Sequence, residues 1–187
     1  MLLLAACLLP GAGTADERPA KGKLLVATEQ IHGDLFTQTV VLLLHYDETG
    51  AVGLVVNRPT DVAPGELLPD DDEIAAYDGT LYWGGPVEMD SIRALLRSDT
   101  PPQSAESIAG SVYLVPFDDA FADLSAGAAR LRFFIGVAGW APGQLELELA
   151  AGSWTVAPAT DDRVFAKDPA ALWHRLAPRQ ELRAALD

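Results

Sequence analysis

The 187-residue sequence has little positive charge, a single cysteine and no long hydrophobic segment. One cysteine, Cys7, excludes an intramolecular disulfide bond and a zinc site made of several cysteines. The sequence has only 13 lysine and arginine residues but 27 aspartate and glutamate residues, which gives a net charge of −14. Because non-specific attraction to DNA or RNA needs basic side chains against phosphates, we expect no direct binding of nucleic acid. The hydrophobic fraction of 49% excludes a wholly disordered chain.

The motifs of several common catalytic sites are also absent. The sequence has neither the Gly-x-Ser-x-Gly turn of α/β-hydrolases nor the Gly-x-x-x-x-Gly-Lys loop that holds phosphates. The stretch Asp61–Gly79 contains seven acidic residues and no basic residue. Within it, Asp70–Glu73 could offer oxygen ligands to Ca²⁺, but the spacing lacks the alternation of an EF-hand loop. A solvated acidic loop is favoured, although such a loop could still meet a basic partner. We expect no metal and no cofactor.

The first fifteen residues carry no charge and begin with an apolar run, Met1–Leu9, that is too short to span a bilayer. This pattern predicts a secretory signal peptide that is cleaved after Ala15, so that the protein is exported to the periplasm. The usual basic residues before the apolar run are missing, which leaves an upstream start or a segment that is no signal. In a second interpretation, Leu4–Cys7 is a lipobox and Cys7 is lipidated. In a third, the run is a buried strand or helix with Cys7 in the core.

After a polar leader at residues 16–22, residues 23–187 have the length of a single domain. Short apolar and β-branched runs predict strands at Leu24–Thr28, Thr39–His45, Ala51–Asn57, Leu81–Trp83, Ile92–Leu96, Val112–Val115, Leu131–Ala138 and Trp154–Ala157. Helices are predicted at Asp118–Ala126, Gln144–Ala151, Pro169–Leu176 and Gln180–Leu186. Turns are predicted at Gly84–Pro86 and Gly139–Gly143. Because strands and helices do not alternate strictly, the order favours an α+β fold over a doubly wound parallel sheet.

Four segments, in this order, resemble the YqgE/AlgH family, also called DUF179 or UPF0301. They are Gly22–Glu29, Phe36–Pro59, Gly84–Val87, and Gly139–Glu146 with the later Asp168–Trp173. The resemblance implies an α+β fold in which a mixed, largely antiparallel sheet curls into a partly closed barrel with flanking helices. It implies no accepted enzymatic reaction, although some members are named as transcriptional regulators. Members are usually cytoplasmic, so the cytoplasm is the alternative to export.

The three histidines, His32, His45 and His174, are dispersed, and none has a metal-ligand partner at helical spacing. In an extended segment, residues two apart face the same side, so His45 and Asp47 could form a histidine–carboxylate pair for general-base catalysis. The interpretation we favour is structural: His45 ends a strand, His32 lies in a loop and His174 lies in a helix.

The glycine-rich turns indicate a candidate binding site, because glycine permits close approach of the backbone and a neighbouring tryptophan can form a wall. We expect this site where the turns converge with the strand end at Asn57. Its candidate residues are His45, Asn57, Gly84, Gly85, Pro86, Gly139, Trp140 and Gln144. The alternative, which we favour, is that the glycines form barrel corners and that Trp140 fills the core.

These observations predict a non-catalytic accessory or regulatory protein that acts on a protein or small-molecule partner. One alternative is a hydrolase that uses His45 with Asp47, and another is a transcriptional regulator that acts indirectly. Contact with a membrane is expected only if Cys7 is lipidated.

Overall fold

The computed structural model describes residues 18–33, 35–67, 70, 72–100, 103–117, 120 and 130–178. The expected signal peptide, with Cys7 and Ala15, lies outside these residues. So do the helix expected at Gln180–Leu186 and, apart from Ala120, the helix expected at Asp118–Ala126.

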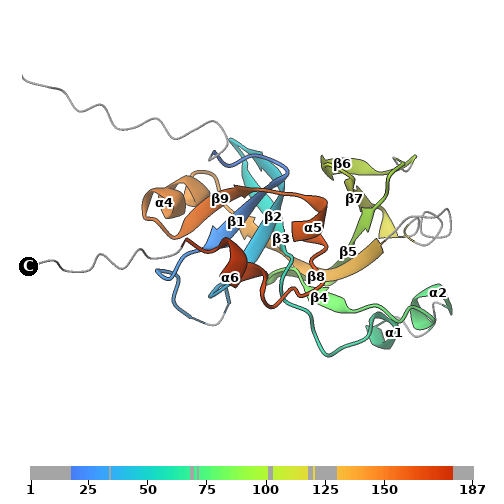
Figure 1. The fold of residues 1–187 in the computed structure, drawn as a ribbon. Coiled ribbons are helices and arrows are strands. Elements are labelled where there is room, and N and C mark those ends of the chain that lie inside the picture. The colour runs from blue at the N-terminus through green and yellow to red at the C-terminus, as the bar shows by residue number, and fades with distance from the viewer. Residues whose placement is uncertain are drawn as a thin grey trace, which may run out of the picture.

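The described chain forms nine strands with short helices between and after them (Figure 1). The elements are β1 (Lys23–Ala27), β2 (Val40–Asp47), β3 (Gly50–Val55), α1 (Pro64–Leu67), α2 (Asp72–Ala75), β4 (Leu81–Trp83), β5 (Val87–Arg97), β6 (Glu106–Ala109), β7 (Val112–Val115), β8 (Arg130–Trp140), α4 (Gln144–Ala150), β9 (Trp154–Pro158), α5 (Asp161–Val164) and α6 (Leu172–Leu176).

One sheet contains all nine strands, in the order β6-β7-β5-β8-β3-β2-β1-β9, with β4 paired beside β8. The paired strands among the described residues are antiparallel, except that β4 runs parallel to β8. The sheet curls into a half-barrel (Figure 1). The long strand β8 pairs with β5 and β4 along its first part and with β3 at its end, and the register between β5 and β8 shifts between Val87 and Ile92. The expected α+β fold with a mixed, largely antiparallel sheet is confirmed.

The two ends of the sheet approach each other beside the start of β1. A Cβ atom added to Gly22 would lie 2.3 Å from the carbonyl oxygen of Ile108 in β6, so the two backbones touch. Lys21 and Glu106 form an ion pair over 2.5 Å at the same place. At the start of α5, Asp161 accepts a hydrogen bond from the Ser111 amide and pairs with Arg97 of β5. These contacts hold the two edges of the half-barrel together.

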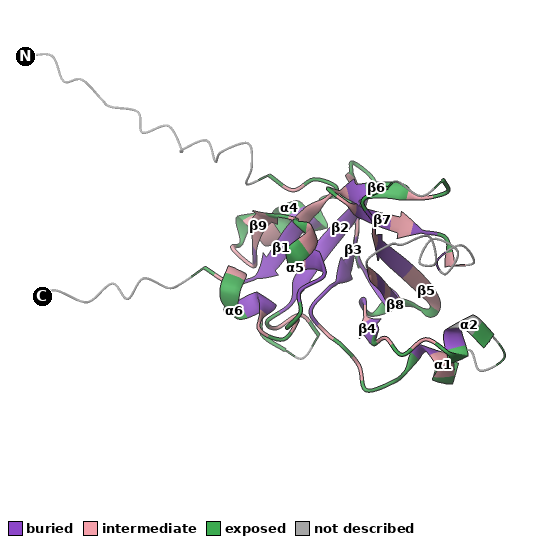
Figure 2. Ribbon diagram, turned by 45° about the vertical axis from the view of Figure 1, so that its right-hand side comes forward, coloured by how far each residue is buried: buried purple, intermediate pink, exposed green. Residues whose placement is uncertain are grey.

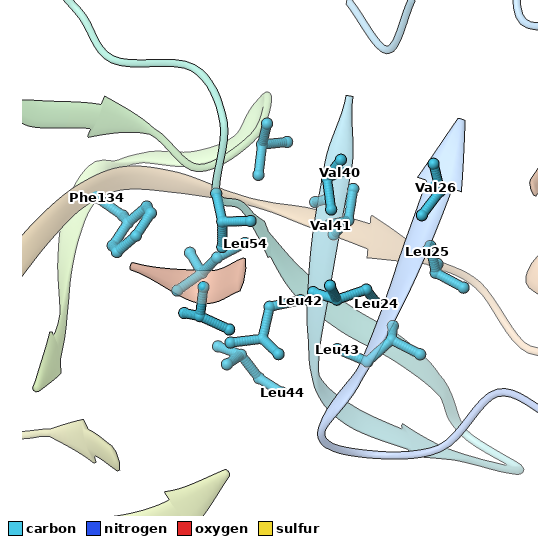
Figure 3. Packing of buried hydrophobic residues seen from close by; sticks show 14 of the residues in the cluster. Leu24, Leu25, Val26, Val40, Val41, Leu42, Leu43, Leu44, Leu54 and Phe134 are labelled. Atoms are coloured by element: carbon cyan, nitrogen blue, oxygen red, sulfur yellow. The ribbon is translucent and has the colours of Figure 1, made fainter. Parts of the chain in front are cut away.

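The core lies against β1, β2 and β3, whose apolar residues are almost fully buried (Figures 2 and 3). Val40–Leu44 is buried at every position, as expected of a strand that is covered on both faces. The C-terminal segment covers one side: Trp173 of α6 donates its indole N–H to the carbonyl of Ala27 over 2.6 Å. Each fully buried leucine in this cluster contributes about 2 kcal/mol through removal of its surface from water.

Several boundaries differ from the predictions for local reasons. The turn predicted at Gly139–Gly143 is wrong at its first two residues, because β8 continues and pairs Gly139 with Val52 and Trp140 with Ala51. The helix predicted at Pro169–Leu176 starts only at Leu172. Before it, the Asp168 side chain accepts the Ala171 amide in a turn. The strand at Glu106–Ala109 was not predicted.

Candidate functional site

Gly84 and Gly85 bring the chain after β4 into backbone contact with β8. A Cβ on Gly84 would lie 2.2 Å from the carbonyl oxygen of Gly136, and one on Gly85 would lie 2.2 Å from the amide of Ala138. Gly85 also has a φ of 154°, at the margin of the region that favours glycine. The next residue, Pro86, is exposed. Gly84 and Gly85 therefore allow close packing of the backbone after β4 against β8.

Trp140 and Gln144 belong to a hydrogen-bonded group centred on Glu148 of α4. The indole N–H of Trp140 donates to Glu148 Oε2 over 2.9 Å, and that of Trp154 donates to the same oxygen over 2.8 Å. Gln144 donates to the other oxygen, Oε1, over 2.9 Å and accepts the Ala141 amide through its own side-chain oxygen. All these polar groups are used to fix α4 against β8 and β9.

The space between the tryptophans is filled by Phe36, which the loop before β2 supplies. Its ring lies 5.9 to 6.4 Å from those of Trp83, Trp140 and Trp154. Asn57 is buried beneath this loop, where it accepts the Val40 amide and donates to the Gln38 carbonyl. Arg58 adds hydrogen bonds to the carbonyls of Leu35 and Thr37, so the loop is tied to the end of β3. The loop before β2 is therefore held in place by the packing of Phe36 against the tryptophans and by the hydrogen bonds of Asn57 and Arg58.

His45 and Asp47 do form the pair that their spacing predicted, with 2.9 Å between Nε2 and Oδ2. The pair lies at the exposed tip of the β2–β3 hairpin, and 54% and 42% of the two side chains are accessible. Two hydrogen bonds from Thr49, with a further contribution from His45, lower the pKa of the Asp47 carboxyl. The carboxylate is therefore engaged mainly with the turn. His45 does not end the strand as expected, because β2 continues to Asp47.

None of the eight predicted site residues lines any of the three cavities described below. In the part of the chain that the structure describes, no group of three histidine, cysteine, aspartate or glutamate side chains could hold a metal ion. No helix among those same residues has the length and apolarity that crossing a membrane requires.

A cavity of about 650 Å³ lies where α5 and α6 meet the start of β8, and we call it the α5–α6 cavity. Four basic residues line it: Arg130, Arg163, Lys167 and Arg175. Two acidic side chains, Asp162 and Asp168, also line it, and Phe165, Ala166 and Leu172 form its buried apolar parts. No motif in the sequence predicts this site.

The linker between α5 and α6 is held against β8 by two arginines that project from the same face of that strand. Arg132 donates to the carbonyls of Val164 and Ala166 over 2.8 and 2.6 Å. Arg130 donates to the intervening carbonyl of Phe165 over 2.9 Å. These three consecutive hydrogen bonds, which we call the arginine strap, fix one wall of the cavity.

Arg132 itself is enclosed by aromatic rings, with its guanidinium 4.5 Å from the centre of the Tyr82 ring and 5.3 Å from that of Phe165. Burial lowers the pKa of this guanidinium, and the neighbouring Arg130 lowers it further. It has no carboxylate partner among the described residues. Its charge therefore adds to the positive potential behind the α5–α6 cavity.

Two other cavities are smaller and have fewer basic side chains in their lining. One of about 400 Å³ lies beside β9, between Arg18, Leu149 and Trp154. The other, of about 450 Å³, lies over β5 and β7, between Arg93, Leu114 and Phe117. Neither gathers more than one basic side chain, so the α5–α6 cavity is the strongest candidate site.

Comparison of the sequence with known proteins gives consistent matches along nearly the whole chain. The sequence profile described as AlgH-like (DUF179) matches residues 24–185. A UPF0301 protein of Streptomyces coelicolor is 35% identical over 175 residues, which are 90% of this chain and 91% of the relative. A UPF0301 protein of Myxococcus xanthus is 39% identical over 154 residues, which are 80% of this chain and 84% of the relative.

Two solved structures have the same fold. A crystal structure of a protein from Corynebacterium diphtheriae matches with a TM-score of 0.76 and 25% identity, over 91% of this chain and 92% of that one. The solution structure of the AlgH protein from Pseudomonas aeruginosa matches with a TM-score of 0.65 and 29% identity, over 84% and 85% of the two chains. With its profile match, its relatives and its half-barrel fold all in agreement, this chain belongs to the AlgH-like family.

Proposed function

We propose that this protein is a non-catalytic accessory or regulatory protein that binds a small molecule in the α5–α6 cavity. The observation that carries the proposal is the size and construction of this cavity. Its volume of about 650 Å³ lies in the range of small-molecule sites, which extends from about 300 to 1,000 Å³. The arginine strap holds one wall in place before any ligand arrives, so little ordering is required on binding.

The lining of the cavity supports binding rather than catalysis. It contains the carboxylates of Asp162 and Asp168, but no histidine, cysteine or serine with which a carboxylate commonly forms a catalytic pair or triad. Arg130, Arg163 and Arg175 each donate to a backbone carbonyl, which holds their side chains in defined positions. Such groups recognise and orient a ligand, but they do not transfer a proton at neutral pH.

A screen of chemically diverse small molecules by thermal shift, followed by calorimetry, tests the proposal. Thr160 lines the cavity, is exposed and makes no side-chain hydrogen bond at the start of α5, so Thr160→Trp should fill the mouth without unfolding the protein. Thr80→Trp, at an exposed position away from the cavity, is the matched control. We expect compounds that bind the original protein and Thr80→Trp but not Thr160→Trp. If binding persists in Thr160→Trp, the cavity is not the site.

A hydrolase is the second candidate, because His45 and Asp47 lie 2.9 Å apart in the geometry of a general-base pair. Their exposure at a hairpin tip places them second, since a general base works best in a site that holds its substrate. Ester, peptide and phosphate substrates should be tested with the original protein and with His45→Ala. Turnover that disappears in His45→Ala would establish the hydrolase and overturn the non-catalytic proposal.

A further inference from the structure

We infer that the ligand of the α5–α6 cavity is a small organic dianion of the phosphate monoester type. This inference rests on the proposed function, which it deepens by naming the chemical class of the ligand. It is supported by the charges of the side chains that line the cavity and by the N–H donors of the basic side chains that have no hydrogen-bond partner among the described residues.

The cavity concentrates positive charge on a strongly acidic protein. Arg130, Arg163, Lys167 and Arg175 are four of the 13 lysine and arginine residues in a chain of net charge −14. Asp162 and Asp168 reduce the local excess to two positive charges. A dianion would neutralise this excess, whereas an uncharged ligand would leave it unbalanced.

The four cations are not consumed by ion pairs within the described part of the chain. The hydrogen bonds of the three arginines go to backbone carbonyls: Arg130 to Phe165, Arg163 to Pro158 and Arg175 to Asp168. A guanidinium has five N–H donors, so each of these groups can still bind an anion. Within the same part of the chain, Lys167 makes no hydrogen bond or ion pair, and its side chain is exposed.

The size and the acidic groups of the cavity favour an organic ligand over inorganic phosphate alone. A phosphate group occupies only a fraction of about 650 Å³, which leaves room for an attached organic group. The carboxylates of Asp162 and Asp168 can accept hydrogen bonds from hydroxyl groups of such a ligand. The guanidinium groups provide the paired donors that match a phosphate.

Calorimetry with ribose 5-phosphate, succinate, inorganic phosphate and ribose tests the inference at low and physiological salt. We expect ribose 5-phosphate to bind more tightly than inorganic phosphate, and ribose not to bind. Succinate tests whether a dicarboxylate satisfies the same charges. Binding should weaken as salt increases, because part of the attraction is between exposed charges.

Charge variants provide matched controls. Lys167→Gln and Arg175→Gln should each weaken binding of ribose 5-phosphate about tenfold, since each removes a charged hydrogen-bond donor. Arg18→Gln changes the net charge of the protein equally but lies outside this cavity, so binding should be unchanged. Asp162→Asn should strengthen binding about twofold, because it removes a negative charge that repels the phosphate, while the amide oxygen can still accept a hydrogen bond from the ligand. Loss of folding would weaken binding in every variant and could not produce these opposite signs.

The possible results separate the inference from the proposed function. Uncharged compounds that bind, and that Thr160→Trp excludes, while no anion binds, would overturn the dianion and leave the binding function intact. Anion binding that is insensitive to Lys167→Gln and Arg175→Gln would also overturn the inference. If succinate binds as tightly as ribose 5-phosphate, the phosphate monoester class is wrong. If neither the diverse library nor these anions bind, both proposals fail.

Discussion

Trp140 and Trp154 donate their indole N–H groups to one and the same atom, Oε2 of Glu148, over 2.9 and 2.8 Å. Their rings meet edge to face, with 6.0 Å between centres and 78° between planes. One carboxylate of α4 thus joins the end of β8 to the start of β9. The carboxylate is therefore a structural group of the fold rather than an acid available for chemistry.

Replacement of Glu148 by glutamine should destabilise the protein by about 1–3 kcal/mol, because charge-assisted hydrogen bonds are stronger than neutral ones. The new amide would also face the Gln144 amide, donor against donor, where Oε1 now accepts. Urea unfolding followed by tryptophan fluorescence measures the change. Glu29→Gln, at an exposed position, is the control and should leave stability unchanged. Equal midpoints for both variants would show that the shared oxygen contributes little.

Two glycines of the predicted turns should respond differently to alanine. A Cβ on Gly84 would meet the Gly136 carbonyl at 2.2 Å, whereas on Gly139 its nearest neighbour is a Val87 methyl group at 3.8 Å. Gly84→Ala should therefore cost about 3 kcal/mol or more, because backbone cannot move away cheaply. Gly139→Ala should change stability by less than about 1 kcal/mol. Thermal unfolding of the two variants checks this order, and similar losses would contradict it.

Arg132→Met should destabilise the protein by about 3 kcal/mol, because the carbonyls of Val164 and Ala166 lose a charged donor. Methionine keeps much of the apolar volume between Tyr82 and Phe165, so the loss reports mainly the hydrogen bonds. Amide hydrogen exchange should show faster exchange in the α5–α6 linker than in the rest of the core. Arg18→Met serves as the control. Unchanged exchange in the linker would mean that packing alone holds it.

Acid should weaken the contact between α5 and the β6–β7 turn. Burial raises the pKa of Asp161, but hydrogen bonds from Ser111 and the charge of Arg97 outweigh it and bring the pKa below the usual 3.8. The stabilising contribution is therefore complete above pH 3.8 and is lost as the pH falls through the lower, native pKa. The melting temperature of Asp161→Asn should lie below that of the original protein at pH 7, and the gap should close as the pH falls through the lowered native pKa of Asp161. A gap that is independent of pH would contradict this assignment.

The expected signal peptide predicts a mature N-terminus at Asp16. Mass spectrometry of the protein from fractionated cells should find Asp16 in the periplasmic fraction. A lipidated Cys7 in the membrane fraction would indicate the lipobox instead. An intact Met1 in the cytoplasm would exclude export by either route.

The strands of the core could be predicted because their residues carry the signal locally. Val40–Leu44 consists only of valine and leucine, and the turn at Asp47–Gly50 marks the hairpin. The Glu106–Ala109 strand was missed because half of it is exposed and its pairing with β7 contains a bulge. Its structure depends on a neighbour rather than on its own pattern.

The α5–α6 cavity could not be predicted, because its basic residues are dispersed between Arg130 and Arg175. Only the folded linker brings Arg163 and Lys167 beside the strand that carries Arg130. A sequence clue existed in the clustering of acidic residues at Asp61–Gly79, since it leaves the rest of the chain less negative than the net charge suggests. The glycine-rich turns are the more visible motif in the sequence, but in the structure Gly84 and Gly85 allow the backbone to pack closely against β8.

The arginine strap binds the backbone of its target. Every residue offers the same carbonyl group, so the three hydrogen bonds of Arg130 and Arg132 do not depend on side-chain identity, whereas the contact of Arg132 with the Phe165 ring does. The exposed side chains of the linker, Lys167 and Asp168, can therefore change during evolution while the buried segment Val164–Ala166 keeps its place on β8. Such an arrangement lets one scaffold acquire new ligand preferences without rebuilding its attachment.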